Sequence, residues 1–104
     1  MREFHHVGIP TEKKRDKEAY LQDAKLYVTD AADSPYGIEW LRFEPDSPLP
    51  KQLKTGPHVA FKVADLEAEL RGKDVLLPPF SPMKGLKVAF ILHEGVPIEF
   101  MQMG

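Results

Sequence analysis

Cysteine is absent from this 104-residue sequence, which excludes disulfides and thiolate metal sites. No strong charge of one sign is present either, since the net charge is −2 and the single basic run, residues 13–15, is flanked by acidic residues. Nucleic-acid binding therefore has no electrostatic support. No stretch approaches the ~20 apolar residues that span a bilayer, and no apolar run of a signal peptide follows Arg2. We expect a cytoplasmic protein without nucleic-acid or membrane partners.

What is present is an ordinary globular composition. Apolar residues make up 42% of the chain, enough to bury a core within one domain spanning residues 1–104. The ten prolines favour many short strands and turns over long helices, because proline lacks the N–H that a helix interior uses.

The clearest element is a strand that begins at His58 and alternates apolar residues at 59, 61 and 63 with His58, Ala60 and Lys62. A similar phrase, His6-Val7-Gly8-Ile9, lies half a chain length earlier. Self-similarity at such an interval indicates repeated units. The sequence therefore predicts two units, residues 1–50 and 56–104, with a linker over Pro45–Thr55.

A glutamate interrupts an apolar strand near the end of each unit. Glu39 lies within residues 37–44, and Glu99 lies within residues 97–103, each on the face opposite its apolar neighbours. Elsewhere the pattern predicts short helices over Glu18–Asp23 and Leu66–Leu70. It also predicts a short strand over Val75–Leu77, which Pro78-Pro79 should end, because prolines remove donors from the ladder.

Two histidines and two glutamates, His6, His58, Glu39 and Glu99, thus occupy matching places. If the units pair about a pseudo-two-fold axis, all four can meet. Imidazole nitrogens and carboxylate oxygens suit a divalent Zn, Ni, Co, Mn or Fe ion. Such a metal can polarise a carbonyl and stabilise an enolate or enediolate, and a neighbouring glutamate can accept the proton.

Three segments resemble the vicinal oxygen chelate superfamily, which includes glyoxalases, bleomycin-resistance proteins and dioxygenases. They are residues 6–10, 57–66 and 95–102. The second half is especially similar to methylmalonyl-CoA epimerases and glyoxalase I relatives. The resemblance implies an α+β protein of two degenerate βαβββ modules, the first abbreviated. Their curved, mostly antiparallel sheet would surround a central cavity.

The resemblance also implies a divalent metal held by His6, His58 and Glu99, with Glu39 as the fourth ligand. His6 is preferred to His5 because it directly precedes the Val-Gly-Ile run, as His58 directly precedes Val-Ala-Phe.

The fourth ligand has a second candidate. Glu44-Pro45 fits the acidic residue and proline that follow this strand in the family, whereas Glu39 fits the strand position and the Ile-Glu phrase. We favour Glu39 and keep Glu44 as the alternative.

The implied activity is that of a glyoxalase-like lyase or isomerase/epimerase acting on a small molecule with vicinal oxygens, with Glu99 and Glu39 as catalytic carboxylates. One alternative is a non-catalytic small-molecule binder of the bleomycin-resistance type. Another is an extradiol-type dioxygenase, which needs Fe(II) with only two histidines and one carboxylate. Because an abbreviated first module would leave a sheet edge uncovered and many relatives are dimers, we expect a homodimer.

Overall fold

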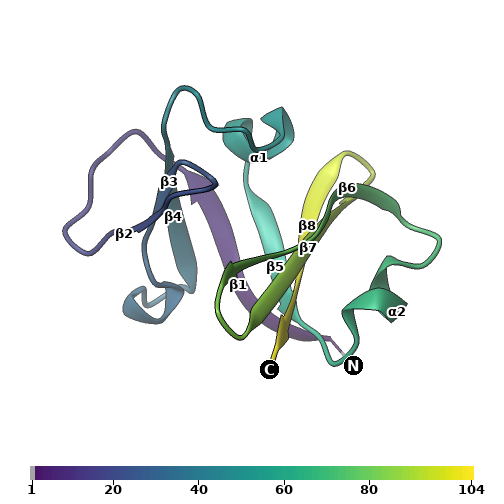
Figure 1. Cartoon of the computed structure of the whole chain (residues 1–104). Coiled ribbons are helices and arrows are strands. Elements are labelled where there is room, and N and C mark those ends of the chain that lie inside the picture. The colour runs from purple at the N-terminus through teal and green to yellow at the C-terminus, as the bar shows by residue number, and fades with distance from the viewer. Residues whose placement is uncertain (1) are drawn as a thin grey trace.

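One curled sheet of eight strands runs through the computed structural model, which describes residues 2–104 (Figure 1). Its strands are ordered β2-β3-β4-β1-β5-β8-β7-β6. In chain order the elements are β1 (Glu3–Pro10), β2 (Ala19–Leu21), β3 (Leu26–Val28), the 3-10 turn η1 (Ala31–Asp33), β4 (Ile38–Phe43), α1 (Lys51–Thr55), β5 (His58–Lys62), α2 (Leu66–Leu70), β6 (Asp74–Met83), β7 (Leu86–His93) and β8 (Val96–Met103).

The two halves of the sheet follow the same plan. β1 pairs with β4 in parallel, β5 pairs with β8 in parallel, and β1 and β5 join the halves as antiparallel neighbours. The remaining pairs are antiparallel. The predicted curved, mostly antiparallel sheet is therefore confirmed. We propose that the two four-stranded groups are the two modules predicted over residues 1–50 and 56–104.

Buried apolar side chains pack on both faces of the second half. One cluster joins Leu53 of α1 to residues on the inner face of the curl, Ala60, Val88, Phe90 and Met101. The other lies where α2 packs against β7 and β8, and contains Val63, Leu66, Ala89, Ile91 and Phe100. Asp65 caps α2, since its Oδ1 accepts a hydrogen bond from the N–H of Ala68.

Replacing Leu66, which is 1% exposed, with alanine should lower the free energy of unfolding by about 2–5 kcal/mol, because the five-residue helix cannot refill the cavity. Urea unfolding measures the change. Glu67→Ala, on the exposed side of α2, serves as the control and should alter stability by less than about 0.5 kcal/mol. Equal effects of the two substitutions would contradict this packing.

The predicted helix over Glu18–Asp23 is wrong. Residues 19–21 form β2, which pairs with β3 so that Tyr20 lies opposite Tyr27, with ring centroids 4.7 Å apart. A six-residue segment forms few helical hydrogen bonds against the cost of nucleation, whereas the cross-strand aromatic pair stabilises a hairpin.

The segment between β1 and β2, residues 11–18, contains no helix in the described structure. The loop there packs charged side chains on the sheet instead. The guanidinium of Arg15 lies 4.1 Å from the ring centroid of Trp40, and Arg42 donates two hydrogen bonds to Glu18, of 2.9 and 2.7 Å. Bidentate and stacked guanidinium contacts of this kind are specific to arginine. We propose that this half, which has no helix between β1 and β2 among the described residues, is the abbreviated module predicted over residues 1–50.

Two further expectations are corrected. The segment Pro45–Thr55 is not only a linker, because it contains α1, whose Leu53 is 2% exposed and belongs to the core. The strand expected over Val75–Leu77 continues through Pro78-Pro79 as the ten-residue β6. Prolines are tolerated because β6 lies at the sheet edge and pairs with β7 through three register shifts.

No helix within residues 2–104 has the length and apolar character needed to cross a membrane.

Candidate metal centre

The four central, neighbouring strands of the sheet each contribute one polar side chain to a single cavity. His6 comes from β1, Glu39 from β4, His58 from β5 and Glu99 from β8. All four line the same cavity, which has a volume of about 110 Å³. His6 and His58 are only 2% and 3% exposed. The fold therefore brings together every residue of the predicted site, although their role as metal ligands stays a prediction.

Strand register explains why these side chains converge. Gly8 lies between its partners Glu39 and His58, and Ala60 lies between its partners His6 and Glu99. Each row thus has a small residue in its middle and larger polar residues on both sides. Since side chains two residues apart share a face, both rows point to the inner side of the curl.

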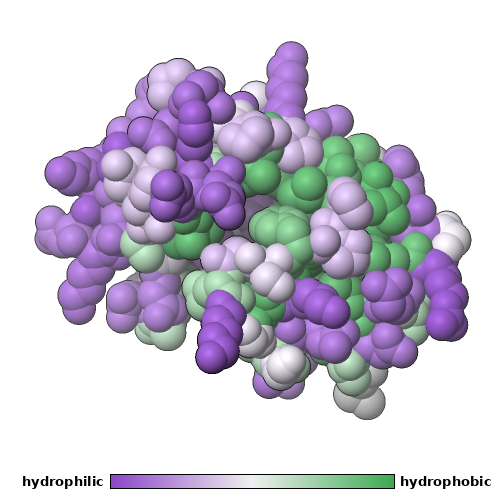
Figure 2. Space-filling view, viewed as in Figure 1, coloured by the Kyte–Doolittle hydropathy of each residue, from purple (hydrophilic) through white to green (hydrophobic). Residues whose placement is uncertain are grey.

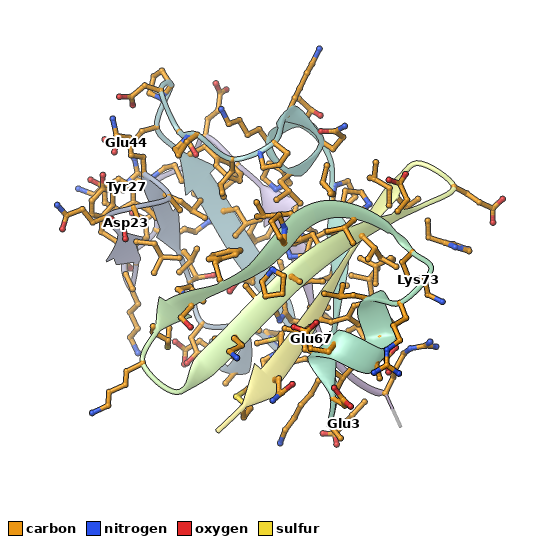
Figure 3. All side chains as sticks on the ribbon, turned by 45° about the vertical axis from the view of Figure 1, so that its right-hand side comes forward. Glu3, Asp23, Tyr27, Glu44, Glu67 and Lys73 are labelled. Atoms are coloured by element: carbon orange, nitrogen blue, oxygen red, sulfur yellow. The ribbon has the colours of Figure 1, made fainter. Side chains whose placement is uncertain are left out.

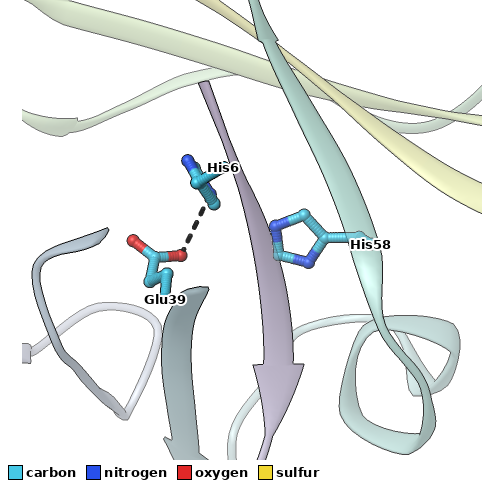
Figure 4. A group of neighbouring side chains, drawn as sticks. All are labelled: His6, Glu39 and His58. Carbon is cyan, nitrogen blue, oxygen red and sulfur yellow. Dashed lines mark ion pairs between the residues drawn. The ribbon is translucent and has the colours of Figure 1, made fainter. Parts of the chain in front are cut away.

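The polar atoms of the site lie within a few ångströms of one another. Nε2 of His58 is 2.9 Å from Oε1 of Glu99. Nε2 of His6 is 3.3 Å from Oε1 of Glu39 (Figure 4). The same nitrogen is 3.5 Å from Oε1 of Glu99. Donor atoms of His6, Glu39 and His58 all lie within 4.8 Å of one another. This spacing is small enough for one ion to reach them after modest side-chain adjustment.

His5 supports the site from outside the cavity, a contact that sequence reasoning missed. The β1–β5 register shifts between Phe4 and His6, so His5 is the extra residue of a β-bulge, which re-aims its side chain. Its Nδ1 lies 2.8 Å from Nδ1 of His6. If His6 donates this hydrogen bond, its neutral ring presents the lone pair of Nε2 to the cavity. His6 therefore lines the cavity, while the preference for His6 over His5 as a metal ligand stays a prediction.

Opposite charges stabilise each other in the site. Burial lowers the pKa of His6, but the carboxylates of Glu39 and Glu99 outweigh it and raise the pKa to about 9. Burial likewise raises the pKa of Glu99, but hydrogen bonding and charge from His58 and His6 lower it to about 2. Near neutral pH a proton on His6 therefore offsets part of the carboxylate charge.

The chemistry of these residues fits a divalent cation. Nδ1 of His58 is a buried nitrogen that has no hydrogen-bond partner among residues 2–104, and Nε2 of His6 lies 3.3 and 3.5 Å from two carboxylate oxygens without a hydrogen bond of good geometry. Such groups are costly to leave unsatisfied. With both imidazoles neutral, the two carboxylates carry a charge of −2, which a divalent ion would balance, and nitrogen with oxygen donors suits Zn, Ni, Co, Mn or Fe(II).

The alternative fourth ligand, Glu44, lies elsewhere. It follows β4, and its carboxylate accepts a hydrogen bond from the hydroxyl of Tyr20 on the exposed side of the hairpin. Figure 3 shows Glu44 at the outer end of this hairpin, near Tyr27 and Asp23. Glu39 is therefore the first-half carboxylate that shares the cavity with the histidines.

Gly8 is a second residue that sequence reasoning missed, although it stands two positions after His6, as Ala60 does after His58. A Cβ added at Gly8 would lie 2.1 Å from Cε1 of His58, inside contact distance. Gly8→Ala should therefore displace the imidazole of His58 and weaken metal affinity at least about 10-fold.

Titration of the metal-free variant with Zn(II) measures that loss. Gly56→Ala is the matched control, because a Cβ there meets nothing within 4 Å and its backbone is extended, with φ −155°. Unchanged metal affinity in Gly8→Ala would contradict the packing of His58 on Gly8.

No protein-family model matches the chain, and no curated protein matches it. Solved structures do. A hypothetical protein from Bacillus halodurans C-125 superposes with a TM-score of 0.70 and 19% identity, covering 99% of this chain and 95% of the other. Methylmalonyl-CoA epimerase from Mycobacterium tuberculosis superposes with a TM-score of 0.67 and 20% identity, and the match covers 98% of this chain and 88% of the epimerase.

A mutant of 4-hydroxymandelate synthase from Streptomyces coelicolor superposes with a TM-score of 0.56 and 17% identity. The match covers 99% of this chain but only 49% of the synthase. At such identities the likeness concerns the fold, and activities do not transfer with it. The superpositions over nearly the whole chain show that this chain has the vicinal oxygen chelate fold.

Proposed function

We propose that this protein is a metal-dependent lyase or isomerase/epimerase that acts on a small molecule with vicinal oxygens through an enolate or enediolate. The convergence of His6, Glu39, His58 and Glu99 in one cavity carries the proposal. His6, His58 and Glu99 would hold the metal, with Glu39 beside them. When bound, a divalent ion would supply Lewis acidity to a carbonyl oxygen of the substrate.

Glu39 is the carboxylate that we assign as the general base. Its side chain is 24% exposed, against 10% for Glu99, so it is more open to a molecule in the cavity. Glu99 lies beside both histidines, whereas Glu39 lies beside His6. Glu39 would take the proton from the carbon next to the carbonyl, and the electron pair of that C–H bond would move toward the carbonyl oxygen. Return of the proton by Glu39 to another atom gives an isomer, whereas an epimer requires a second acid that delivers a proton to the opposite face.

The presence of Glu39 in the cavity supports this reaction class over a dioxygenase. A dioxygenase needs open metal positions for both substrate and oxygen, and two histidines with one carboxylate suffice for it. The paired carboxylates also favour catalysis over simple sequestration, since a binder needs no base.

Metal analysis followed by proton exchange tests the proposal. Chelator-treated protein should take up one equivalent of Zn, Ni, Co or Mn. The metal-loaded protein should then incorporate deuterium from D₂O at the carbon next to the carbonyl of a small molecule with vicinal oxygens, and this exchange should not require O₂. Oxygen uptake by the Fe(II)-loaded protein with catechols would overturn it in favour of a dioxygenase. Tight ligand binding without metal or turnover would overturn it in favour of a binding protein.

A homodimer stays a prediction. The edge strands β2 and β6 do not favour pairing between chains, because β2 has three residues and β6 carries prolines that cannot donate. Association would instead use side-chain surfaces such as that of Phe4 and Tyr36, which are 54% and 81% exposed. Sedimentation at micromolar concentration should give twice the chain mass of 11.8 kDa, and a monomer would contradict the prediction.

A further inference from the structure

The cavity wall beyond the four polar residues is apolar throughout. Every other lining residue within the described part of the chain is an apolar side chain, and these include Leu26, Leu41, Phe43, Val88, Phe90 and Met101. The ring of Phe90 also packs edge-on against His58, with centroids 5.2 Å apart. The cavity thus has a polar end, where the imidazoles and carboxylates converge, and an apolar remainder.

Positive charge is missing from this wall. No lysine or arginine lines the cavity among residues 2–104, so a carboxylate or phosphate held away from the polar end would lose its hydration without gaining a partner. Burying an unpaired charge is among the costliest events in a protein interior. An ammonium group against the same wall would meet the same penalty. The body of the ligand should therefore be neutral.

The size of the cavity limits the ligand. The cavity has a volume of only about 110 Å³, so its polar end accepts a compact molecule. Cavities that hold drug-sized ligands are larger, about 300–1,000 Å³.

Access runs between the two edges of the curled sheet. Leu21, Ala24, Phe80 and Pro82 line both the cavity and an outer hollow of about 410 Å³ next to the β2–β3 hairpin and β6. Figure 2 shows hydrophobic residues around the hollow on this face, with hydrophilic residues covering the first-half side. A ligand would pass these four apolar side chains where the hollow meets the cavity, whereas the rest of the hollow is lined by Tyr20, Gln22, Asp23 and Ser81.

We propose that the substrate is a small neutral molecule that presents two adjacent oxygens to the polar end and buries a compact apolar body against the wall. This inference rests on the proposed function and narrows its substrate class. It excludes substrates whose body carries a second charged group inside the cavity, such as phosphorylated compounds and dicarboxylates.

Hydroxamates test the inference, because they chelate metals through two oxygens. The Zn(II)-loaded protein is titrated with acetohydroxamate, 4-methylpentanohydroxamate and succinate monohydroxamate by calorimetry. The last two have the same shape and differ in an isopropyl group against a carboxylate. We expect the isopropyl compound to bind at least about 10-fold more tightly than acetohydroxamate, because of its buried apolar groups. We expect the affinity of 4-methylpentanohydroxamate to be at least about 100-fold higher than that of succinate monohydroxamate, because the wall offers no partner to the carboxylate.

A charge placed in the wall provides the second arm. Met83 lines the cavity and is 56% exposed, so Met83→Lys should fold. It should improve binding of succinate monohydroxamate at least about 10-fold. Met103→Lys is the matched control, since Met103 is 44% exposed and lies outside the cavity lining, and it should leave the affinities unchanged.

The outcomes separate the inference from the proposed function. In one outcome, acetohydroxamate binds to the metal-loaded protein and not to the metal-free protein, while 4-methylpentanohydroxamate and succinate monohydroxamate bind with equal affinity. That result would overturn the proposed substrate class and leave the metal site standing. Failure of every hydroxamate to bind, together with no metal uptake, would overturn both.

Discussion

Replacing His58 with alanine should remove stoichiometric metal binding, with affinity reduced at least about 100-fold. His58 is 3% exposed, and its Nε2 lies 2.9 Å from Glu99 in the cavity. The substitution therefore removes a nitrogen donor and leaves a buried carboxylate with one partner fewer. Elemental analysis after loading with Zn(II) measures the loss. His93→Ala is the matched control, because the side chain of His93 is 71% exposed at the end of β7, and it should bind metal like the wild type.

The fold should persist in His58→Ala. His58 lies on the cavity face and contacts Phe90. The expected cost in unfolding free energy is about 1–3 kcal/mol, because the buried carboxylate of Glu99 loses one of its two histidine partners. Circular dichroism and urea unfolding distinguish this modest change from global unfolding. A well-folded His58→Ala protein that still holds one metal ion per chain at wild-type affinity would rule out His58 as a ligand.

Replacing Glu39 with glutamine should lower the rate of proton exchange by about 10²–10⁴-fold, because the amide keeps the shape of the carboxylate but cannot accept the proton. Metal affinity should fall less, since His6, His58 and Glu99 remain. The rate is measured by deuterium incorporation from D₂O, and metal affinity by titration, so that the two effects are separated. Glu44→Gln, outside the cavity, should change neither by more than about 2-fold.

Glu39→Gln also distinguishes between reaction classes. If Glu39 is the base, the rate falls while the metal is retained. If Glu39→Gln exchanges protons at the wild-type rate, the base must be another group, and Glu99→Gln is the next variant to examine. If the Fe(II)-loaded protein consumes oxygen equally well with and without Glu39, a centre of two histidines and one carboxylate explains the activity better.

Local pattern was sufficient to predict which residues share a strand face. Because side chains alternate with period two, His6 falls on the face of Gly8, and Glu99 falls on the face opposite Ile98 and Phe100. Repetition of the His6 phrase at His58 added the expectation of two similar units. The face of its own strand on which each histidine and glutamate lies therefore followed from the sequence pattern, whereas the curved sheet was implied by the resemblance to the vicinal oxygen chelate superfamily.

Pattern failed where neighbours outweigh local preference. Pro78-Pro79 reads as the end of a strand, yet β6 continues because an edge strand can leave its outer donors unpaired. Residues 19–21 form a strand because β3 lies beside them and supplies the pairing of Tyr20 with Tyr27. Contacts of this kind join residues on separate strands, and a local sequence window does not contain both partners.

The sequence alone determined the donor types of the site, the absence of thiolate ligands and the alternation that places each of the four polar residues on one face of its own strand. The tertiary structure decided which of the candidate residues meet, and how closely. Register between β4, β1, β5 and β8 placed Glu39 rather than Glu44 in the cavity and set the ring of His58 against Gly8. The curl of the sheet then enclosed those polar groups with an apolar wall that lacks a cation within residues 2–104. Both depend on pairing between strands distant in the chain, which a period of two cannot specify.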